Sequence, residues 1–415
     1  MRAGESGLVA RLAHNQKVVG SNPTPATKDR SPLLFPDTMA DIVIDSREEK
    51  KLKEELAKRT DPDGLRMRRY LSMPDLSRTP GNPLYEIVKE ARAIPVLKDF
   101  DNIIIPEIVP ADVSFDLFDF APDHPARSAS DTYYVDHTHI LRPHDTVMWY
   151  YYTQLPQVKE KIARREKFGV VCYGKVYRKD EIDRHHMNVF HQFGGWYLAP
   201  SATTPLTFDD LKNALGDIVK GLFGENTRYR FLDDTFPYTD PSLQVEVEVH
   251  GQWIEILGGG MTKQSVFKKF NVEGYNAWAF GFGLERLAII SMELPDIRLL
   301  WSKDERVKRQ LHMGQKFVEV SKYPSITRDI SFVVQNSFVP NDYFDMIRDL
   351  GGDLIEEVSL LDKYENKEKF GGERVSYTYR IVYRSNERTL TTEEINPIQD
   401  KIIEETKQKF RAEVR

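Results

Sequence analysis

The chain has 415 residues, 40% of them hydrophobic, which is enough for two domains with separate cores. The formal charge of -6 argues against a protein that coats nucleic acid indiscriminately. The single cysteine, Cys172, excludes an intramolecular disulfide and a cysteine-cluster metal site, and it fits a reducing compartment. No apolar run approaches the roughly 18 residues that a membrane helix needs, so we expect no contact with a membrane.

Residues 1–38 are polar, rich in Ser, Pro and Thr, and without periodicity, which indicates a disordered extension. An arginine-bearing, acid-poor start is typical of a mitochondrial transit peptide. Alternatively, Gly20-Ser21-Asn22-Pro23 matches one reading frame of the T-arm of a transfer-RNA gene, in which case translation begins at Met39. We expect a cytoplasmic protein, or one of the mitochondrial matrix if the extension is a genuine transit peptide.

Two helices are expected next, at 46–59 with Ser46 as N-cap and at 82–93 with Asn82 as N-cap. The β-branched run 101–109 predicts one long strand that closes or crosses a dimer-like surface. Further along, the patterns predict a strand at 132–135, an amphipathic helix at 208–222, a hairpin at 244–257 through His250-Gly251, and a strand that becomes a buried helix at 278–290.

The most informative stretch follows a strand predicted at 170–177. Arg178 and Asp180 occupy alternate positions, so both side chains leave the same face. His186 and Phe190 are four residues apart and can return to that face, the first as a phosphate donor and the second as a flat surface for a purine. Taken alone, the stretch is more typical of an exposed charged hairpin.

From about residue 321 the pattern restarts as two helices among strands. Strands are expected at 328–335, 354–364 and 374–384, helices at 341–350 and 392–410, and a short final strand is possible. This is the ferredoxin-like order. Arg380 and Arg384 share one face of a strand, which indicates phosphate contacts or, alternatively, a solvated sheet face.

Together these motifs resemble a class II aminoacyl-tRNA synthetase. Motif 2 (R-x-E/D, a loop, then H/R-x-x-x-F) and motif 3 (G-x-G-x-x-R) are matched by Arg178, Asp180, His186, Phe190, Gly281, Gly283 and Arg286. HPAR, DTYY, LRPH, FHQ, DTFPYTDPS, WIEILGGGM and WAFGFGLERL resemble the catalytic subunit of phenylalanyl-tRNA synthetase. SKYPSITRDISF, GGDLI and YRSNERTL resemble its ferredoxin-fold anticodon-binding domain, so residues 85–415 are similar to the single-chain, mitochondrial type.

The resemblance implies an α+β fold: a class II antiparallel sheet flanked by helices, followed by a ferredoxin-like βαββαβ domain. We expect the extension 1–38, a helical region 39–92, a catalytic domain 93–320 and an anticodon-binding domain 321–415. Fusion of both parts on one chain points to a monomer. The implied reaction joins L-phenylalanine to tRNA(Phe) through a phenylalanyl-adenylate, with ATP and Mg²⁺ and no tightly bound organic cofactor.

Activation requires the substrate carboxylate to attack the α-phosphorus of ATP, so the protein must position two anions. By the resemblance, Arg178 bridges the α-phosphate and the carboxylate, Arg286 clamps the γ-phosphate, and His186 assists. Asp180 and Phe190 would hold the adenine. Glu255 would contact the adenylate or a metal, and Asp240 matches a family position that can hold Mg²⁺.

For the amino acid, the resemblance implies that Phe236 and Tyr238 flank the substrate ring and that Ala279 and Phe280 bound the depth of the pocket. His144, Thr146 and Gln192 would serve its polar end. The alternative for Phe236, Tyr238 and Ala279 is ordinary core packing. In the tail, Arg380, Arg384 and Arg388 would contact tRNA.

One position departs from the family. After FHQ and one further residue the family usually has a glutamate that helps to hold the substrate ammonium, but here Gly194 follows Phe193. Asp145, inside LRPHDT, stands where the family has an uncharged residue and is a candidate for the lost charge. Two rival functions stay open: a class II paralogue for another amino acid, and a catalytically silent RNA-binding protein. We expect no hydrolytic editing domain.

Overall fold

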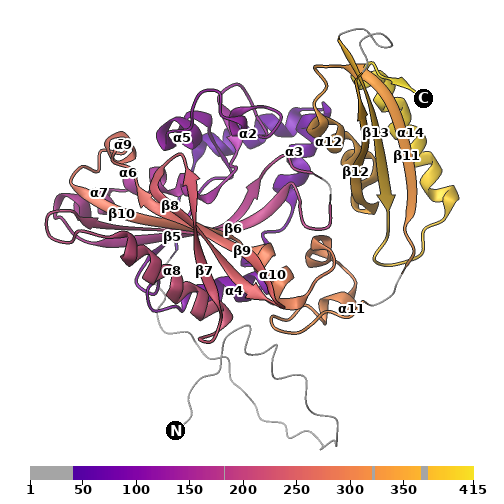
Figure 1. Cartoon of the computed structure of the whole chain (residues 1–415). Helices are drawn as coiled ribbons and strands as arrows, with labels where there is room; N and C mark the ends of the chain where they lie inside the picture. The colour runs from indigo at the N-terminus through magenta and orange to yellow at the C-terminus, as the bar shows by residue number, and fades with distance from the viewer. Residues whose placement is uncertain (1–40, 182, 320–322, 366–372) are drawn as a thin grey trace, which may run out of the picture.

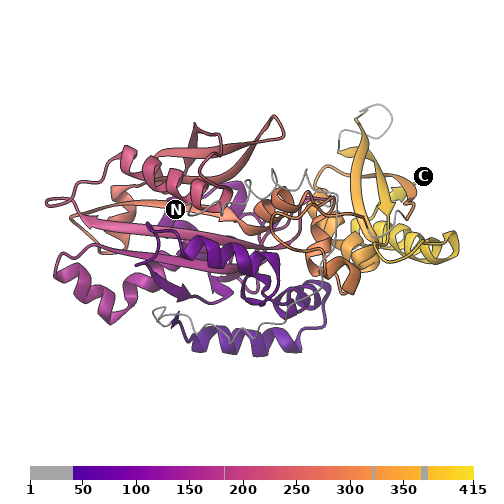
Figure 2. The ribbon, with the colours of Figure 1, turned by 90° about the horizontal axis from the view of Figure 1, so that it is seen from below.

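The computed structural model describes residues 41–181, 183–319, 323–365 and 373–415. The expectations for residues 1–38 and for a start at Met39 lie outside the described residues. Figure 1 shows a large unit built on a twisted sheet and, beside it in yellow, a smaller C-terminal unit; Figure 2 shows the smaller unit again at one end. Within the described ranges, no helix is long and apolar enough to cross a membrane.

The large sheet has eight strands in the order β1-β2-β5-β6-β10-β9-β8-β7. The strands are β1 (Ile42–Val43), β2 (Asp101–Ile104), β5 (Phe168–Tyr177), β6 (Val189–Pro200), β7 (Tyr229–Phe236), β8 (Thr239–Val249), β9 (Gln252–Thr262) and β10 (Tyr275–Gly283). Every pairing from β5 to β7 is antiparallel, while β1 and β2 add parallel at one edge. The predicted antiparallel sheet is therefore confirmed.

Helices cover both faces of this sheet because residues along each strand alternate between two apolar cores. On one face lie α4 (Pro83–Arg92), α8 (Phe208–Phe223) and α10 (Leu284–Met292), and β6 contributes Phe193 to that core. On the other lie α5 (Ala111–Phe115), α6 (Met148–Gln154), α7 (Pro156–Ala163) and α9 (Gln264–Lys269), and β6 contributes Trp196, which stacks on Trp149.

The C-terminal unit runs β11 (Ile326–Gln335), α12 (Pro340–Gly351), β12 (Ile355–Tyr364), β13 (Arg374–Tyr383), α14 (Thr392–Phe410) and β14 (Glu413–Val414). Its antiparallel sheet has the order β12-β13-β11-β14. This is the predicted βαββαβ arrangement, and it includes the short last strand. Its aromatic core, with Phe332, Tyr343 and Tyr379, packs between the sheet and the two helices.

The helices that the sequence predicted lie within a residue or two of the expected bounds. The helix predicted at 46–59 is α2 (Arg47–Lys58), and the Ser46 hydroxyl accepts a hydrogen bond from the Glu49 N–H at 3.0 Å. In the hairpin between β8 and β9, His250 and Gly251 have φ values of 52° and 79°. Two successive positive φ angles are what a tight hairpin turn requires. The large unit also contains α3 (Pro62–Ser72), β4 (His139–Leu141) and α11 (Glu305–Lys308).

Two strand predictions are wrong. The run 101–109 forms two strands in different sheets, since β2 joins the large sheet while β3 (Ile108–Pro110) pairs with β4. Pro106 between them has no N–H to continue a ladder. The strand expected at 132–135 is reduced to one bridge, Tyr134 to Ile140, because the segment starts in a turn where the Thr132 N–H bonds the Ser128 carbonyl.

The two units meet through charged and polar groups. The buried Arg66 of α3 pairs with Asp345 at 3.3 Å and with Asp349 at 2.5 Å, both on α12. Glu356 of β12 pairs with Arg184 of the large unit at 2.5 Å and with Arg384 of its own unit at 2.6 Å. Among the described residues, each apolar cluster belongs to one unit alone. The contact also reaches the residues after β5, because Arg348 donates to the backbone carbonyls of 180 and 181.

Candidate active site

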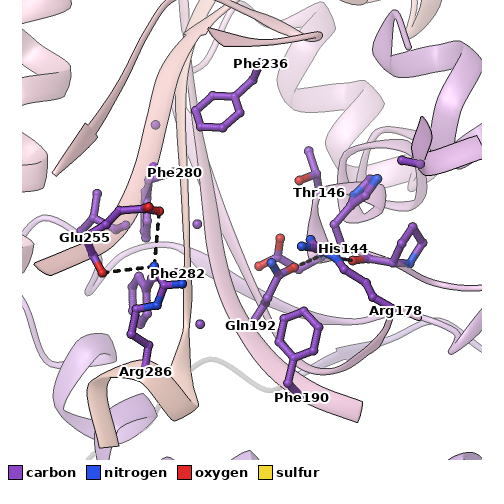
Figure 3. Close-up of a pocket in the computed structure, with 18 of the residues that line it drawn as sticks. His144, Thr146, Arg178, Phe190, Gln192, Phe236, Glu255, Phe280, Phe282 and Arg286 are labelled. Atoms are coloured by element: carbon purple, nitrogen blue, oxygen red, sulfur yellow. Dashed lines mark hydrogen bonds and ion pairs between the residues drawn. The ribbon is translucent and has the colours of Figure 1, made fainter. Parts of the chain in front are cut away.

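A cavity of about 1060 Å³ lies over the face of the large sheet on which Trp149 of α6 packs against Trp196 of β6. Its walls come from segments far apart in sequence: the loop around residues 143–146, the ends of β5 and β6, the β7–β8 turn, β9, and the junction of β10 with α10. A volume of this size can hold a nucleotide and a second small molecule together. Figure 3 shows the labelled side chains that face it.

The floor of the cavity is a row of glycines. Gly194 of β6, Gly281 of β10 and Gly258 of β9 stand opposite one another in register. A Cβ at Gly258 would lie 2.8 Å from the Phe236 ring, and one at Gly194 would lie 2.8 Å from the carboxyl carbon of Asp145. Because these glycines have no side chains, other groups pack directly on the sheet. Asp145 lies at one end of the row and Phe236 at the other.

Arg178 and Phe190 form one wall, as the sequence predicted. Arg178 follows β5, its Nε donates to the Pro143 carbonyl at 2.8 Å, and its guanidinium lies 5.2 Å from the centre of the Phe190 ring. Gln192 is two residues further along β6, on the same side of the strand. This wall offers a cation beside a flat aromatic surface, which suits a nucleotide phosphate and its base.

Arg286 and Glu255 form the opposite wall (Figure 3). Arg286 stands in the first turn of α10, and its Nη1 lies 3.5 Å from Glu255 Oε1 and donates to the Glu255 backbone carbonyl at 3.2 Å. Both side chains are about half exposed, at 48% each. The guanidinium thus retains open donor positions toward the cavity.

His186 and Asp180 border the mouth of the cavity on the loop after β5. His186 is exposed, and its Nδ1 lies 2.7 Å from Asp183 Oδ2. This hydrogen bond raises the pKa of His186 above its ordinary value, while partial burial opposes the shift. A raised pKa favours the protonated imidazole, the form that is suited to contact a phosphate.

An aromatic pocket closes the far end. Phe236 and Tyr238 stack with ring centres 6.2 Å apart, and Tyr238 meets Phe118 and Trp149 edge-on at 5.6 and 5.7 Å. Ala279 borders the same region. Edge-to-face partners of this kind are arranged to receive one more ring.

The polar end of the pocket carries His144, Asp145, Thr146 and Gln192. Burial, with Arg178 adding to it, lowers the pKa of His144 to about 3, so the imidazole is neutral; its ring stacks on Phe120. Gln192 Oε1 accepts from the Asp145 N–H at 3.1 Å. Burial raises the pKa of Asp145 to about 7, against the opposing charges of Arg142 and Arg178.

Some expected site residues are not brought together with the rest. Phe280 borders the cavity, but its ring lies on the other face of the sheet, where it covers Gly195 and stacks on Phe193. The reason is the alternation along β10, which turns Ala279 and Gly281 toward the cavity and Phe280 away. Asp240 is exposed and does not line the cavity. In the described ranges, no group of three or more His, Cys, Asp or Glu could hold a metal.

The three tail arginines lie apart from this cavity, each beside an acid. Arg380 pairs with Asp329 at 2.7 Å and Arg388 with Glu394 at 2.7 Å, both on the surface. Arg384 pairs with Glu356 at the junction of the two units.

Sequence reasoning missed two buried supports of the site. His191 Nδ1 lies 2.6 Å from Glu285 Oε1, which ties β6 to the residue before Arg286. Arg142 donates from Nε to the Lys175 carbonyl at 2.8 Å and from Nη1 to the Ile105 carbonyl at 3.0 Å, and so fixes the loop that carries Asp145. His191 stands inside the motif FHQ and Arg142 inside LRPH. Their partners are distant in sequence, so a linear pattern does not reveal these contacts.

Comparison with known proteins agrees with this geometry. A family model described as tRNA synthetases class II core domain (F) matches residues 71–311, and one described as ferredoxin-fold anticodon binding domain matches residues 321–415. The Arabidopsis thaliana chloroplastic/mitochondrial phenylalanine–tRNA ligase is 39% identical over 77% of this chain and 70% of its own length. The mitochondrial phenylalanine–tRNA ligase of Mus musculus is 35% identical (75% and 74% covered), and a probable mitochondrial one from Drosophila melanogaster is 32% identical (81% and 80%). These organellar names give no support to the cytoplasmic location expected above.

Proposed function

Since the chain belongs to the class II aminoacyl-tRNA synthetases, in the phenylalanine–tRNA ligase family, we infer that it is the ATP-dependent ligase that joins L-phenylalanine to tRNA(Phe). The observation that carries this inference is the cavity itself: two arginines face each other over a glycine floor, and an aromatic pocket opens beside them. The reaction needs these three features together.

In the proposed mechanism, ATP lies between the two walls. Its base stacks on Phe190, Arg286 meets the terminal phosphate, and Arg178 neutralises the charge that develops at the α-phosphorus. His186 donates to the phosphates, and Asp180 accepts from the adenine amino group. No side-chain nucleophile takes part, since the substrate carboxylate itself attacks.

The amino acid would enter with its ring between Phe236, Tyr238 and Ala279, and with its polar end toward Gln192, Thr146 and His144. Its carboxylate then points to Arg178. Divalent cations would arrive with ATP, and Glu255 is the acid at the phosphate wall that can meet them when Arg286 turns to the nucleotide. We keep Asp240 out of this proposal because it is exposed outside the cavity.

ATP–pyrophosphate exchange across the amino acids, followed by charging of tRNA(Phe), tests the function. We expect exchange with phenylalanine and transfer to tRNA. Exchange with a different amino acid would indicate the paralogue, a possibility kept open by Gly194. Absence of exchange with any amino acid would indicate a silent RNA-binding protein, against which the presence of both Arg178 and Arg286 speaks.

We further propose that the enzyme works as a monomer in an organelle, on the basis of the fused anticodon-binding unit and the organellar relatives. A fusion of residues 1–45 to a fluorescent reporter checks the location. Import into mitochondria or chloroplasts supports a transit peptide. A diffuse cytoplasmic signal favours instead a start at Met39, and recovery of any peptide from residues 1–30 of the native protein excludes that start.

A further inference from the structure

Asp145 is a buried acid without an adequate partner. Its side chain is 4% exposed at the beginning of the short helix Asp145–Val147, and its Oδ2 has no hydrogen-bond partner. A carboxylate in this setting loses its hydration, and the charges of Arg142 and Arg178 compensate only part of the cost in free energy. An acid in this state at the wall of a cavity is suited to bind a cationic group of a ligand.

Gly194 makes room for this acid. A Cβ at residue 194 would overlap the Asp145 carboxylate, so the acid takes the space that a side chain on β6 would otherwise fill. The neighbouring glycine in register, Gly281, leaves more room, because a Cβ there would still be 3.8 Å from Asp145 Oδ1. The carboxylate therefore lies over the first two glycines of the floor, and the third, Gly258, lies under Phe236.

Hydrogen bonds connect Arg178 to the loop that carries Asp145. Arg178 Nε donates to the carbonyl of Pro143, two residues before Asp145, and Gln192 accepts from the Asp145 N–H. In an α-amino acid, one carbon separates the ammonium from the carboxylate. A site for it needs an acid and a guanidinium side by side, with the pocket for the side chain opening next to them.

We propose that Asp145 receives the ammonium group of the amino-acid substrate, in the space that Gly194 leaves open on the sheet. The proposal deepens the proposed function and depends on it. In this arrangement the substrate ammonium lies at Asp145 and its carboxylate at Arg178, and its ring points toward Phe236 and Tyr238.

Calorimetric binding of three small molecules to the full chain tests this role. L-Phenylalanine carries both charges, L-phenylalaninol keeps only the ammonium, and 3-phenylpropionate keeps only the carboxylate. In Asp145→Asn, we expect the Kd of the first two to rise about 10- to 100-fold, the range for a charge-assisted hydrogen bond. The Kd of 3-phenylpropionate should stay the same or fall, because a like charge has been removed from its site.

Asp119→Asn is the matched control. Asp119 lies on a neighbouring segment and bonds Lys269 and Ser265 away from the cavity, so all three Kd values should remain those of the wild type. Gly194→Ala provides an independent variant, since its methyl group displaces the acid without removing it. It should weaken phenylalanine and phenylalaninol more than 3-phenylpropionate.

Equal weakening of all three molecules in both variants, or no change in either, would overturn the proposal. If Asp145→Asn does not fold, as judged by its melting curve, Gly194→Ala decides alone. Failure of the proposed function has a different signature. In that case the wild type does not bind phenylalanine, and the same three-way comparison is made with whichever amino acid supports pyrophosphate exchange and with its alcohol and deaminated analogues.

Discussion

The charge state of Asp145 links the amino-acid site to the stability of the fold. Because burial raises its pKa to about 7 in the folded chain, the folded state binds a proton more tightly than the unfolded chain does. Its contribution to stability is therefore most favourable below the unfolded pKa near 4 and is lost as the pH rises through about 7.

We accordingly predict that Asp145→Asn stabilises the free protein at pH 8, by on the order of 2–4 kcal/mol, and changes little at pH 4.5. Denaturant unfolding at the two pH values measures this difference. Asp119→Asn, at an acid whose pKa is lowered, serves as the comparison. A variant that is destabilised at both pH values would contradict the view that the buried Asp145 carboxylate costs free energy in the folded state.

Selectivity for phenylalanine over tyrosine depends on the aromatic pocket. An apolar pocket rejects an added hydroxyl by only about 100-fold, so we predict measurable tyrosine charging of tRNA(Phe). Ala279→Gly, which deepens the pocket, should increase this mischarging, whereas Ala277→Gly, two residues earlier on the same face of β10, should not. No Tyr-tRNA under full phenylalanine charging would count against this view of the pocket.

At this scale the sequence indicated which residues gather at the cavity, because motif 2 and motif 3 each join two elements that are consecutive in the chain, β5 with β6 and β10 with α10. Arg178, Phe190 and Arg286 all border the cavity. Phe280 also borders the cavity, but the alternation along β10 turns its ring to the other face of the sheet, which the sequence prediction did not take into account. That Asp145 overlies Gly194 depends on two segments 49 residues apart and needed the structure.

Among the elements, the junction of β10 with α10 holds the phosphate wall. Glu285 is buried there and accepts hydrogen bonds from the His191 backbone N–H at 2.9 Å and from its ring at 2.6 Å. The Leu76 N–H in turn donates to His191 Nε2 at 3.0 Å. The first turn of α10, which carries Arg286, is thus anchored to β6.

We predict that Glu285→Ala raises the KM for ATP at least tenfold and leaves the Kd of phenylalanine nearly unchanged. The substitution leaves donors of His191 unsatisfied, at a cost of about 1–3 kcal/mol, and frees the residue beside Arg286. Glu293→Ala, at the partly exposed residue that caps the far end of α10, is the control. A parallel loss of ATP and phenylalanine binding would mean that Glu285 serves general stability instead.

Element types and ends followed from local chemistry, notably caps, positive-φ turns and apolar periodicity. The capping box of α14 is an example, since Thr391 and Glu394 bond each other's backbone N–H groups as the sequence suggested. The division of 101–109 between two sheets could not be foreseen in the same way. Which sheet a short strand joins is decided by partners distant in sequence, here β5 for β2 and β4 for β3.

At the scale of the molecule, the C-terminal unit lies against the loop of the active site, and Arg384 stands at that junction. We predict that Arg384→Glu weakens tRNA charging while ATP–pyrophosphate exchange continues. The charge reversal places a second acid beside the buried Glu356. The variant therefore loses a candidate phosphate contact, and it also disturbs the ion pair between Glu356 and Arg184.

Arg380→Glu separates these two effects. Arg380 lies on β13, which ends just before Arg384, but its partner Asp329 is on the surface, and exposed pairs contribute little to stability. If the sheet face binds tRNA, Arg380→Glu should raise the KM for tRNA with an unchanged melting temperature. Loss of exchange together with charging in Arg384→Glu would indicate a defect of folding.

The polar junction between the two units also bears on the thermodynamics of the whole chain. Each described apolar cluster is complete within one unit, and the contacts named between the units, such as those of Arg66, Glu356 and Arg348, are ion pairs and hydrogen bonds. Heat-capacity changes come chiefly from the exposure of apolar surface. Separation of the two units would therefore expose little apolar surface and produce only a small change in heat capacity. Raised ionic strength would favour the separation, because it weakens ion pairs.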